Sequence, residues 1–341
     1  MKEQIRCAVL GLGRLGYWHA ENLATRVKGA TLVYVADPFE KQAEKVAREL
    51  NIGKSTKNPN EVFEDPTIDA VIIATPTSTH AEMIQLAAKH KKHIFVEKPL
   101  THDLQEAVQV IQTIKENNIF CQVGFMRRFD SAYMEAHNRI QAGDIGTPLY
   151  FKGVSRDPGS PPAEFIKNSG GIFLDMSIHD YDISRYLLGS EVTSISAHGN
   201  ILFHSFMEPY HDVDQAIAYL TFDSGAAADI EASRNAFYGY DIRGEVIGSE
   251  GSIQIGSLRH HDIQILTKSG STHDIVPAFP ERFKNAYLNE IEHYIDCLRN
   301  NEKPSVDEMD GKIALEIALS AKKSFETGRK VLLSNPTLSL D

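Results

Sequence analysis

The sequence predicts an α/β protein of two domains: an N-terminal doubly wound parallel sheet, followed by an α+β domain with an open, mostly antiparallel sheet. Two observations favour this class. Short β-branched segments alternate with helical patterns over the first third of the chain, whereas a strand-rich region begins near residue 192. The chain has 341 residues, which is more than the roughly 250 to 300 at which single cores stop growing.

The N-terminal domain is expected to span residues 1–124, with a boundary near Gly124. Its predicted strands are 5–10, 31–36, 70–74, 93–96 and 119–123. The predicted helices between them are 15–27, 40–50, 79–89 and 104–117. Each helix begins close to a capping or turn residue, such as Thr79 or Asp103. This alternation is typical of right-handed βαβ units.

The second domain is expected to span residues 125–341. Helical patterns are found at 131–141, 173–188, 286–299 and 307–327. From 192 to 266 the pattern is strand-rich, with apolar and polar residues alternating over 215–221 and turn signals at 223–225 and 249–251. These strands predict an open antiparallel sheet.

Composition and charge limit the kinds of molecule that this protein is expected to bind. Hydrophobic residues make up 42% of the chain and charged residues 24%, as in ordinary globular proteins. The 35 Lys and Arg against 46 Asp and Glu leave a net charge of −11, which argues against nucleic acid or an anionic membrane as the main partner. The sequence shows neither a signal-peptide pattern nor an apolar run of about 18 residues, so we expect a cytoplasmic protein. Cys7, Cys121 and Cys297 are widely spaced, which predicts buried thiols.

A glycine-rich turn directly follows the first predicted strand and opens the first helix. Its sequence is Gly11-Leu12-Gly13-Arg14-Leu15-Gly16. Gly11 permits a tight turn, Gly13 lets the backbone approach a pyrophosphate, and Gly16 permits close packing of the helix on the strand. The helix N-terminus supplies N–H groups and a positive dipole end for phosphates. In this strand–turn–helix context the motif predicts a Rossmann domain that binds a dinucleotide.

Asp37 ends the second predicted strand, roughly 20 residues after the last glycine of the turn. A carboxylate at this place accepts hydrogen bonds from the adenosine ribose and repels a 2′-phosphate, so the expected cofactor is NAD rather than NADP. Two alternatives stay open. Asp37 and Pro38 are also typical of a turn that ends a strand, and Arg14 could reach a phosphate.

The next two strands end in further candidate residues. Ligands of such sheets bind outside the carboxyl ends of the strands, so Thr75, Pro76 and His80 are expected near the nicotinamide ribose. A capping turn before the following helix is the alternative. The next strand ends in Glu97 and Lys98, and Lys98 is expected in the same crevice, where a cation can bind a substrate hydroxyl. An ordinary surface charge is the alternative for this lysine.

The segment after Gly170-Gly171 carries a second candidate constellation. Asp175, His179 and Asp182 have the helical spacing i, i+4 and i+7, which predicts two carboxylates flanking an imidazole on one face. A histidine oriented by a carboxylate is a competent general base near neutral pH. A solvated helix face is the alternative. The sequence contains no H-E-x-x-H motif, so no catalytic metal is expected.

Together these motifs resemble the Gfo/Idh/MocA oxidoreductase family, and the resemblance covers nearly the whole chain. It rests on the glycine fingerprint, on Glu97-Lys98-Pro99, and on Gly170-Gly171 followed by Asp175 and His179. Residues 125–130 and the surroundings of Asp157 are similar to the inositol 2-dehydrogenase branch of the family, including its NAD-dependent scyllo-inositol enzymes.

The resemblance implies roles for particular residues. The implied catalytic set is Lys98, Asp175 and His179. The expected substrate neighbours are Met126, Arg127, Asp157, His179 and Tyr238. For Arg127 a buried salt bridge is the alternative, and Tyr238 could simply pack on the sheet. The family also implies a homotetramer joined through exposed sheet faces.

The expected reaction is the NAD-dependent oxidation of one secondary hydroxyl of scyllo- or myo-inositol to the 2-keto-inositol. His179 would remove the hydroxyl proton, oriented by Asp175, while Lys98 would stabilise the developing oxyanion. The roles of Lys98 and His179 could be exchanged. Two alternatives remain: a dehydrogenase acting on a glucose-like pyranose, and a non-catalytic sensor that binds NAD(H).

Overall fold

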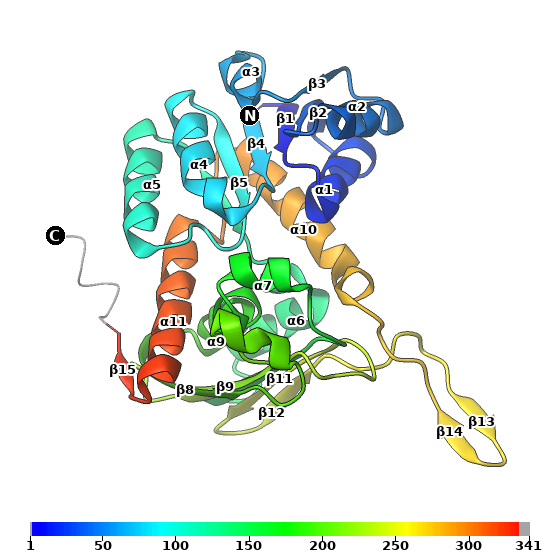
Figure 1. The fold of residues 1–341 in the computed structure, drawn as a ribbon, viewed down its shortest axis with the longest axis vertical. Helices are drawn as coiled ribbons and strands as arrows, with labels where there is room; N and C mark the ends of the chain where they lie inside the picture. Colours follow the sequence, from blue (N-terminus) through cyan, green and yellow to red (C-terminus); the bar gives the residue numbers. More distant parts are fainter. Residues whose placement is uncertain (1, 334–341) are drawn as a thin grey trace. The chain divides into compact units, whose positions relative to one another are not determined.

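The chain divides into two units in the computed structural model, which describes residues 2–333 (Figure 1). The first unit contains the residues up to Met126 together with Asn285–Leu315. The second contains Arg127–Lys284 together with the chain from Glu316 onward. The boundary near Gly124 is therefore only part of the division, because the chain returns to the first unit after completing most of the second.

A six-stranded parallel sheet, in the order β3-β2-β1-β4-β5-β6, forms the centre of the first unit. Its strands are β1 Ile5–Leu10, β2 Ala30–Ala36, β3 Lys54–Thr56, β4 Ala70–Ile73, β5 His93–Glu97 and β6 Cys121–Gly124. The strand order reverses between β1 and β4, which is where ligands bind in doubly wound sheets. The predicted parallel sheet is confirmed. Only the three-residue β3 escaped prediction, because it is too short to show a pattern.

The helices of the first unit agree with the predicted alternation, except that the six-residue α3 was not predicted. They are α1 Arg14–Thr25, α2 Glu40–Glu49, α3 Pro59–Glu64, α4 His80–Lys89 and α5 Leu104–Asn117. Asp103 caps α5, since its carboxylate accepts the N–H groups of Gln105 and Glu106 at 2.8 and 2.9 Å. Thr79 is not a side-chain cap. It ends a 3₁₀ turn over Thr77–Thr79 and donates its hydroxyl to Thr75 Oγ1 at 2.7 Å.

The helix α10 Phe279–Asn300 lies mostly in the first unit, so the two compact units differ from the contiguous division into 1–124 and 125–341. Buried residues of α10 pack in the same core as residues of β1 and β5. The ring of Tyr294, for example, meets that of Phe95 edge-on at 5.8 Å. An apolar helix face shows that a core is present but does not say which core, so local pattern could not assign this helix to the core of the first unit.

The second unit is built on a seven-stranded sheet in the order β12-β11-β7-β10-β9-β8-β15. Its strands are β7 Pro148–Arg156, β8 Val192–Asn200, β9 Gln215–Phe222, β10 Ala227–Ser233, β11 Asp241–Gly248, β12 Ser252–Ile255 and β15 Val331–Leu332. Only the β7–β10 pair is parallel, which confirms the mostly antiparallel expectation. The sequence did not predict β7, since Lys152 and Arg156 interrupt its apolar pattern.

Helices cover one face of this sheet, as Figure 1 shows for α6, α7 and α9. The helices that begin in or enter this unit are α6 Ser131–Gln141, α7 Ala163–Ser169, α8 Ile172–Asp175, α9 Ile178–Leu188 and α11 Glu308–Thr327. The buried Ala228, Ile230 and Ala232 of β10 face the helices, whereas Asp229 and Glu231 point to the opposite, open face. The hairpin of β13 Ile265–Thr267 and β14 Gly270–Thr272 projects from this unit.

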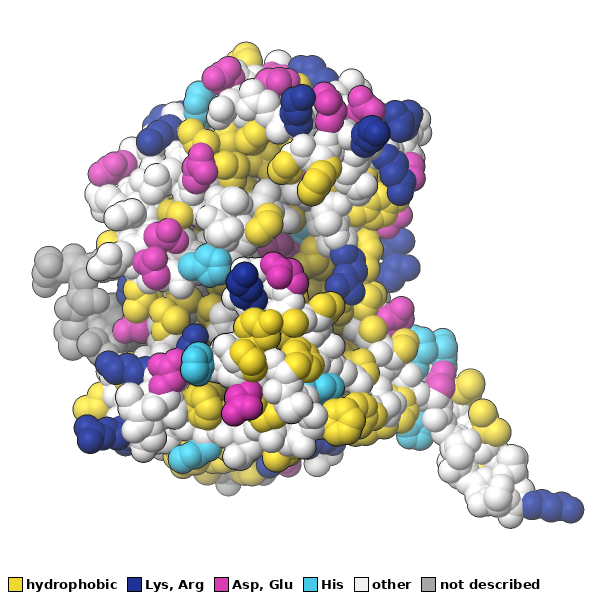
Figure 2. All heavy atoms as spheres, in the orientation of Figure 1, with side chains coloured by type: hydrophobic (Ala, Val, Ile, Leu, Met, Phe, Trp, Pro, Cys, Tyr) yellow, Lys and Arg dark blue, Asp and Glu magenta, His cyan; other side chains and the backbone are white. Residues whose placement is uncertain are grey.

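The surface carries both signs of charge. Figure 2 shows Lys and Arg side chains interspersed with Asp and Glu over the face that it draws. Among the helices of residues 2–333, none combines the length and apolar character that crossing a membrane requires.

Candidate active site

The glycine-rich turn joins β1 to α1 with the geometry that its sequence predicts. Gly11 has a φ of +84°, and a Cβ there would lie 2.7 Å from the carbonyl oxygen of Ala74. A Cβ on Gly16 would lie 1.8 Å from the carbonyl oxygen of Gly11. At Gly13, in contrast, no described atom lies within 4 Å of the Cβ position. The backbone at Gly13 is therefore open to close approach by a phosphate group.

The start of α1 offers backbone donors to an anion. Among the described residues, no side chain caps the helix at Gly13 and no acidic residue occupies its first turn, which leaves its N–H groups and positive dipole end for a ligand. Leu12 contributes through its backbone, because its side chain lies in the hydrophobic core. Arg14 is exposed and Leu15 is half-buried at the beginning of the helix.

Asp37 lies beside this turn. Its carboxylate accepts the N–H of Leu12 at 2.8 Å and the N–H of Phe39 at 2.9 Å. A carboxylate offers about four lone-pair sites, so capacity remains for ribose hydroxyls. The contact with Leu12 joins the end of β2 to the glycine turn, which is the arrangement that a Rossmann dinucleotide site requires.

The segments after β4 and β5 end at the same edge of the sheet, because the two strands pair in parallel with Ile73 opposite Val96. Thr75 is half-buried and Pro76 is exposed. His80 is buried, and its ring nitrogens lie 2.9 Å from the carbonyl oxygen of Pro99 and 3.0 Å from that of Thr75. Burial lowers the pKa of His80, with the two carbonyls acting in the opposite direction. The buried imidazole of His80 thus links the loop after β4 to the loop after β5.

Glu97 is the last residue of β5, and Lys98 follows it at the sheet edge. The side chain of Glu97 is buried and lies against His19 of α1, with 2.6 Å between Glu97 Oε1 and His19 Nε2. Lys98 is partly exposed. The first unit therefore presents Thr75 and Lys98 at the edge where the open glycine turn also lies.

In the second unit, Asp175 and His179 do not share a continuous helix. The helix α8 ends at Asp175 and α9 begins at Ile178, with a two-residue turn between them. The N–H of Ser177 donates to the carbonyl of Ile172, five residues back, at 3.1 Å. This wider turn interrupts the regular helical ladder between Asp175 and His179, so a single face carrying Asp175, His179 and Asp182 stays a prediction. His179 is buried in the first turn of α9.

Asp182 is engaged away from this constellation. It forms a bidentate ion pair with Arg128, with distances of 2.6 Å to Nη2 and 2.8 Å to Nε. The neighbouring pair is similar: Arg127 Nη1 lies 2.6 Å from Asp180 Oδ1, and Arg127 Nη2 donates to Ser155 Oγ at 3.0 Å. All four charged side chains are buried. The guanidinium of Arg127, expected near the substrate, is thus held inside the second unit by an ion pair.

Arg234 is a residue of this site that sequence reasoning missed. Its side chain is only 1% exposed and continues the inward alternation of β10. Arg234 Nη2 lies 3.4 Å from Asp175 Oδ2, and Nη1 lies 3.9 Å from Asp157 Oδ2. The available signal was a charged residue at an inward-facing position after an alternating strand. A buried guanidinium there implies carboxylates nearby.

The backbone conformation and the close packing of Asp212 explain why a glycine occupies position 171 at the start of α8. Gly171 has a φ of +86°, and a Cβ there would lie 2.8 Å from Asp212 Oδ1. The same oxygen accepts the N–H of Ile172 at 2.9 Å and so satisfies the start of α8. Gly171 and Asp212 together set the direction of the short helix that ends in Asp175.

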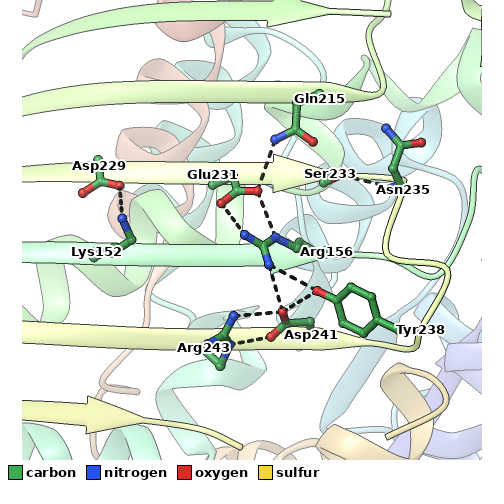
Figure 3. A network of polar contacts seen from close by, with 10 residues as sticks. All are labelled: Lys152, Arg156, Gln215, Asp229, Glu231, Ser233, Asn235, Tyr238, Asp241 and Arg243. Carbon is green, nitrogen blue, oxygen red and sulfur yellow. Dashed lines mark hydrogen bonds and ion pairs between the residues drawn. The ribbon is translucent and has the colours of Figure 1, made fainter. Parts of the chain in front are cut away.

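Tyr238 belongs to a polar network on the open face of the sheet. Its hydroxyl donates to Asp241 Oδ2 at 2.7 Å and accepts from Arg156 Nη1 at 3.2 Å, while Arg156 also binds Glu231 in a bidentate manner (Figure 3). Tyr238 therefore contacts Arg156 and Asp241, whereas Asp175 and Asp157 lie against Arg234. Met126, another expected substrate neighbour, is buried at the end of the first unit.

Comparison with known families covers both units. Residues 5–125 match the model for the oxidoreductase family, NAD-binding Rossmann fold, and residues 137–333 match that for its C-terminal alpha/beta domain. The chain belongs to the Gfo/Idh/MocA oxidoreductase family. This confirms the resemblance seen in its motifs, and it makes the first unit the family's NAD-binding Rossmann domain.

Several members of the Gfo/Idh/MocA family are similar over their full length. The scyllo-inositol 2-dehydrogenase (NAD(+)) of Bacillus subtilis (strain 168) is 60% identical, covering 98% of this chain and 97% of that one. The myo-inositol 2-dehydrogenase of Thermotoga maritima is 39% identical, covering 96% and 98%. The structure of scyllo-inositol dehydrogenase from Lactobacillus casei with NAD(H) and scyllo-inositol aligns with a TM-score of 0.92 at 31% identity, covering 96% and 99%.

Proposed function

We propose that this protein is an NAD-dependent dehydrogenase that oxidises one secondary hydroxyl of an inositol to the 2-keto-inositol, with scyllo-inositol as the preferred isomer. The 60% identity to a scyllo-inositol 2-dehydrogenase across 98% of the chain carries the proposal. The Lactobacillus casei relative, which binds NAD(H) and scyllo-inositol, supports it. The presence of Lys98, Asp175 and His179 in this chain supplies the groups that such a reaction needs.

The cofactor fits the residues of the first unit. The open backbone at Gly13 and the uncapped start of α1 suit a pyrophosphate, and Asp37 suits the ribose hydroxyls. NAD, when bound, supplies the acceptor for the hydride that leaves the alcohol carbon. We assign the nicotinamide side of the site to Thr75, Pro76 and Lys98, with His80 holding the two loops together.

The proposed proton chemistry uses Lys98, His179 and Asp175. Lys98 binds the reacting hydroxyl oxygen and stabilises its developing negative charge, whereas the imidazole of His179 removes the hydroxyl proton. Asp175 orients His179 and is itself held by Arg234 at 3.4 Å. The proton could instead pass to Lys98, with His179 as hydrogen-bond donor. The remaining hydroxyls of a neutral polyol need polar partners, and we assign Asp157, Met126 and Arg127 to the surroundings of the substrate, with Tyr238 at its border.

Formation of NADH, followed by its absorbance, tests the proposed reaction. The panel contains scyllo-inositol, myo-inositol, glucose and acyclic polyols, each with NAD. We expect the highest kcat/KM with scyllo-inositol and measurable turnover with myo-inositol. A preference for glucose would favour the sugar dehydrogenase instead. Tight binding of NAD without turnover of any polyol would favour a sensor.

The cofactor preference yields a separate prediction. Asp37→Ser is expected to lower kcat/KM for NAD about 10- to 100-fold, because hydrogen bonds to a charged group contribute roughly 1.5 to 3 kcal/mol. It should lower kcat/KM for NADP less, since the repulsion of the 2′-phosphate is also removed. Steady-state kinetics with both cofactors measure this. Asp144→Ser, at an exposed carboxylate of the second unit, is the control. A wild-type preference for NADP would contradict the role of Asp37.

We also propose a homotetramer that uses the open face of the seven-stranded sheet. Ile217 and Tyr219 of β9 lie on that face and are 47% and 48% exposed, so both faces of the strand are apolar. Light scattering coupled to size-exclusion chromatography should therefore give four times the mass of one chain, and a monomer mass would contradict the proposal.

The cytoplasmic location stays a prediction that cell fractionation can test.

A further inference from the structure

Three buried titratable side chains meet inside the first unit, next to Lys98 in the chain. They are His19 of α1, Glu97 at the end of β5 and Glu290 of α10. One ligand atom from each lies within 4.8 Å of the others. The distance of 2.6 Å between His19 and Glu97 is that of a charge-assisted hydrogen bond. Two ligands of one tetrahedral zinc ion would lie more than about 3 Å apart, so this geometry favours a direct contact over a metal site.

Glu290 is the unusual member of this cluster, which we call the buried triad. Among the described residues, neither of its carboxyl oxygens has a hydrogen-bond partner, although both are buried. Two carboxylates this close in a dry interior do not both ionise. Burial, and then the negative charge of Glu97, raise the pKa of Glu290 well above its usual value.

Besides burial, Glu97 is the group that acts on the pKa of Glu290. Tyr294, Cys7 and Cys121 are buried with it, and burial raises the pKa of each, so these groups stay neutral. Gln122 of β6 donates to the backbone oxygen of Glu290 at 2.9 Å and is uncharged.

Glu97 is confined by three neighbouring elements. His19 contacts it from α1, and Glu290 approaches it from α10. Its third neighbour is Gly124 of β6, which pairs with Glu97 across the sheet. A Cβ on Gly124 would lie only 3.0 Å from Glu97 Oε2. Because Lys98 is the next residue in the chain, a backbone displacement at Glu97 moves the backbone of Lys98 as well.

We propose that Glu290 is a positioning residue for the reaction, which holds Glu97 and through it sets the place and charge surroundings of Lys98. A neutral Glu290 fills the space beside Glu97 without adding a second buried negative charge, whereas an ionised Glu290 would repel Glu97. The inference rests on the proposed function, in which Lys98 binds the reacting oxygen.

Two substitutions of Glu290 and one control test this role. Glu290→Gln keeps the size of a neutral side chain without an ionisable group, whereas Glu290→Ala removes the packing against Glu97. We expect kcat within about threefold of wild type for Glu290→Gln. For Glu290→Ala we expect kcat to fall on the order of 100-fold, as for a displacement of about 1 Å near the reacting atoms, with KM for NAD changed less than about threefold. Glu308→Ala removes another buried carboxyl of the same unit and should leave kcat within about threefold.

A second readout does not depend on turnover. Competitive acetylation with trace acetic anhydride, followed by mass spectrometry, reports the reactivity of Lys98 relative to the exposed Lys89. We expect the relative reactivity of Lys98 to change at least about threefold in Glu290→Ala and to return to the wild-type value in Glu290→Gln. If Glu290→Ala does not fold, Glu290→Leu fills the same space without polar atoms and takes its place.

Several outcomes would overturn the inference. Unchanged kcat and unchanged Lys98 reactivity in Glu290→Ala would do so, as would an equal loss of kcat in Glu308→Ala or a failure of Glu290→Gln to restore Lys98 reactivity. If the wild-type protein oxidises no polyol, the proposed function fails, while the acetylation of Lys98 still decides the role of Glu290.

Discussion

Replacement of His179 by alanine is expected to lower kcat about 10²- to 10⁴-fold, the usual contribution of a positioned general base. His179 lies buried at the start of α9, in the second unit, and the cofactor residues lie in the first unit. The substitution should therefore leave the dissociation constant of NAD within about threefold of wild type, because it removes a group needed only for the chemical step.

Stopped-flow and steady-state measurements of NADH formation, together with titration of NAD by calorimetry, measure the two effects. His198→Ala is the matched control, since His198 is exposed on β8. Wild-type turnover in His179→Ala would remove His179 from the mechanism. A comparison with Lys98→Ala assigns the proton, because the variant that loses the general base should also lose the pH dependence of kcat/KM.

Removal of the Asp180 carboxylate is expected to cost about 3 to 5 kcal/mol of folding stability. Asp180→Ala leaves the guanidinium of Arg127 buried without its ion pair, and only the hydroxyl of Ser155 remains of its two partners described above. The side chains of Asp180 and Arg127 are 0% and 4% exposed, so water does not replace the lost interaction.

Urea and thermal unfolding, followed by fluorescence, measure the loss of stability. Glu135→Ala is the control, because it removes the partner of Arg139 in an exposed i,i+4 pair and should leave the unfolding transition unchanged. If Asp180→Ala unfolds at the same urea concentration as wild type, the pair does not stabilise the second unit. Simultaneous replacement of Arg127 by methionine should recover part of the stability, since it removes the buried unpaired charge.

The family and the cofactor domain were accessible from sequence because their signals are local. The glycine turn needs particular residues at particular positions, as the φ of Gly11 and the contact of Gly16 with the Gly11 carbonyl show. Helices with an apolar face, such as α5 and α6, agree with their predicted bounds, and α5 also has the capping residue Asp103. Both depend on interactions within about a dozen residues.

The site was less accessible, because its arrangement depends on interactions between distant residues. The spacing of Asp175 and His179 suggested one helix face, but the turn before Ile178 interrupts it. Arg234 reaches Asp175 across 59 positions in the chain, a separation at which spacing carries no information. The packing of α10 in the core of the first unit brings Glu290 to Glu97, and it likewise depends on residues that are far apart in the chain.

By itself, the sequence determined the doubly wound sheet, the dinucleotide turn and the family, because the residues that specify each of them are neighbours along the chain. Only the tertiary structure decided how charges are paired: Asp182 with Arg128, Arg127 with Asp180, Arg234 with Asp175, and Glu290 beside Glu97. The physical reason is that burial makes an unpaired charge costly, and the partner that removes this cost is selected by the fold and not by sequence distance.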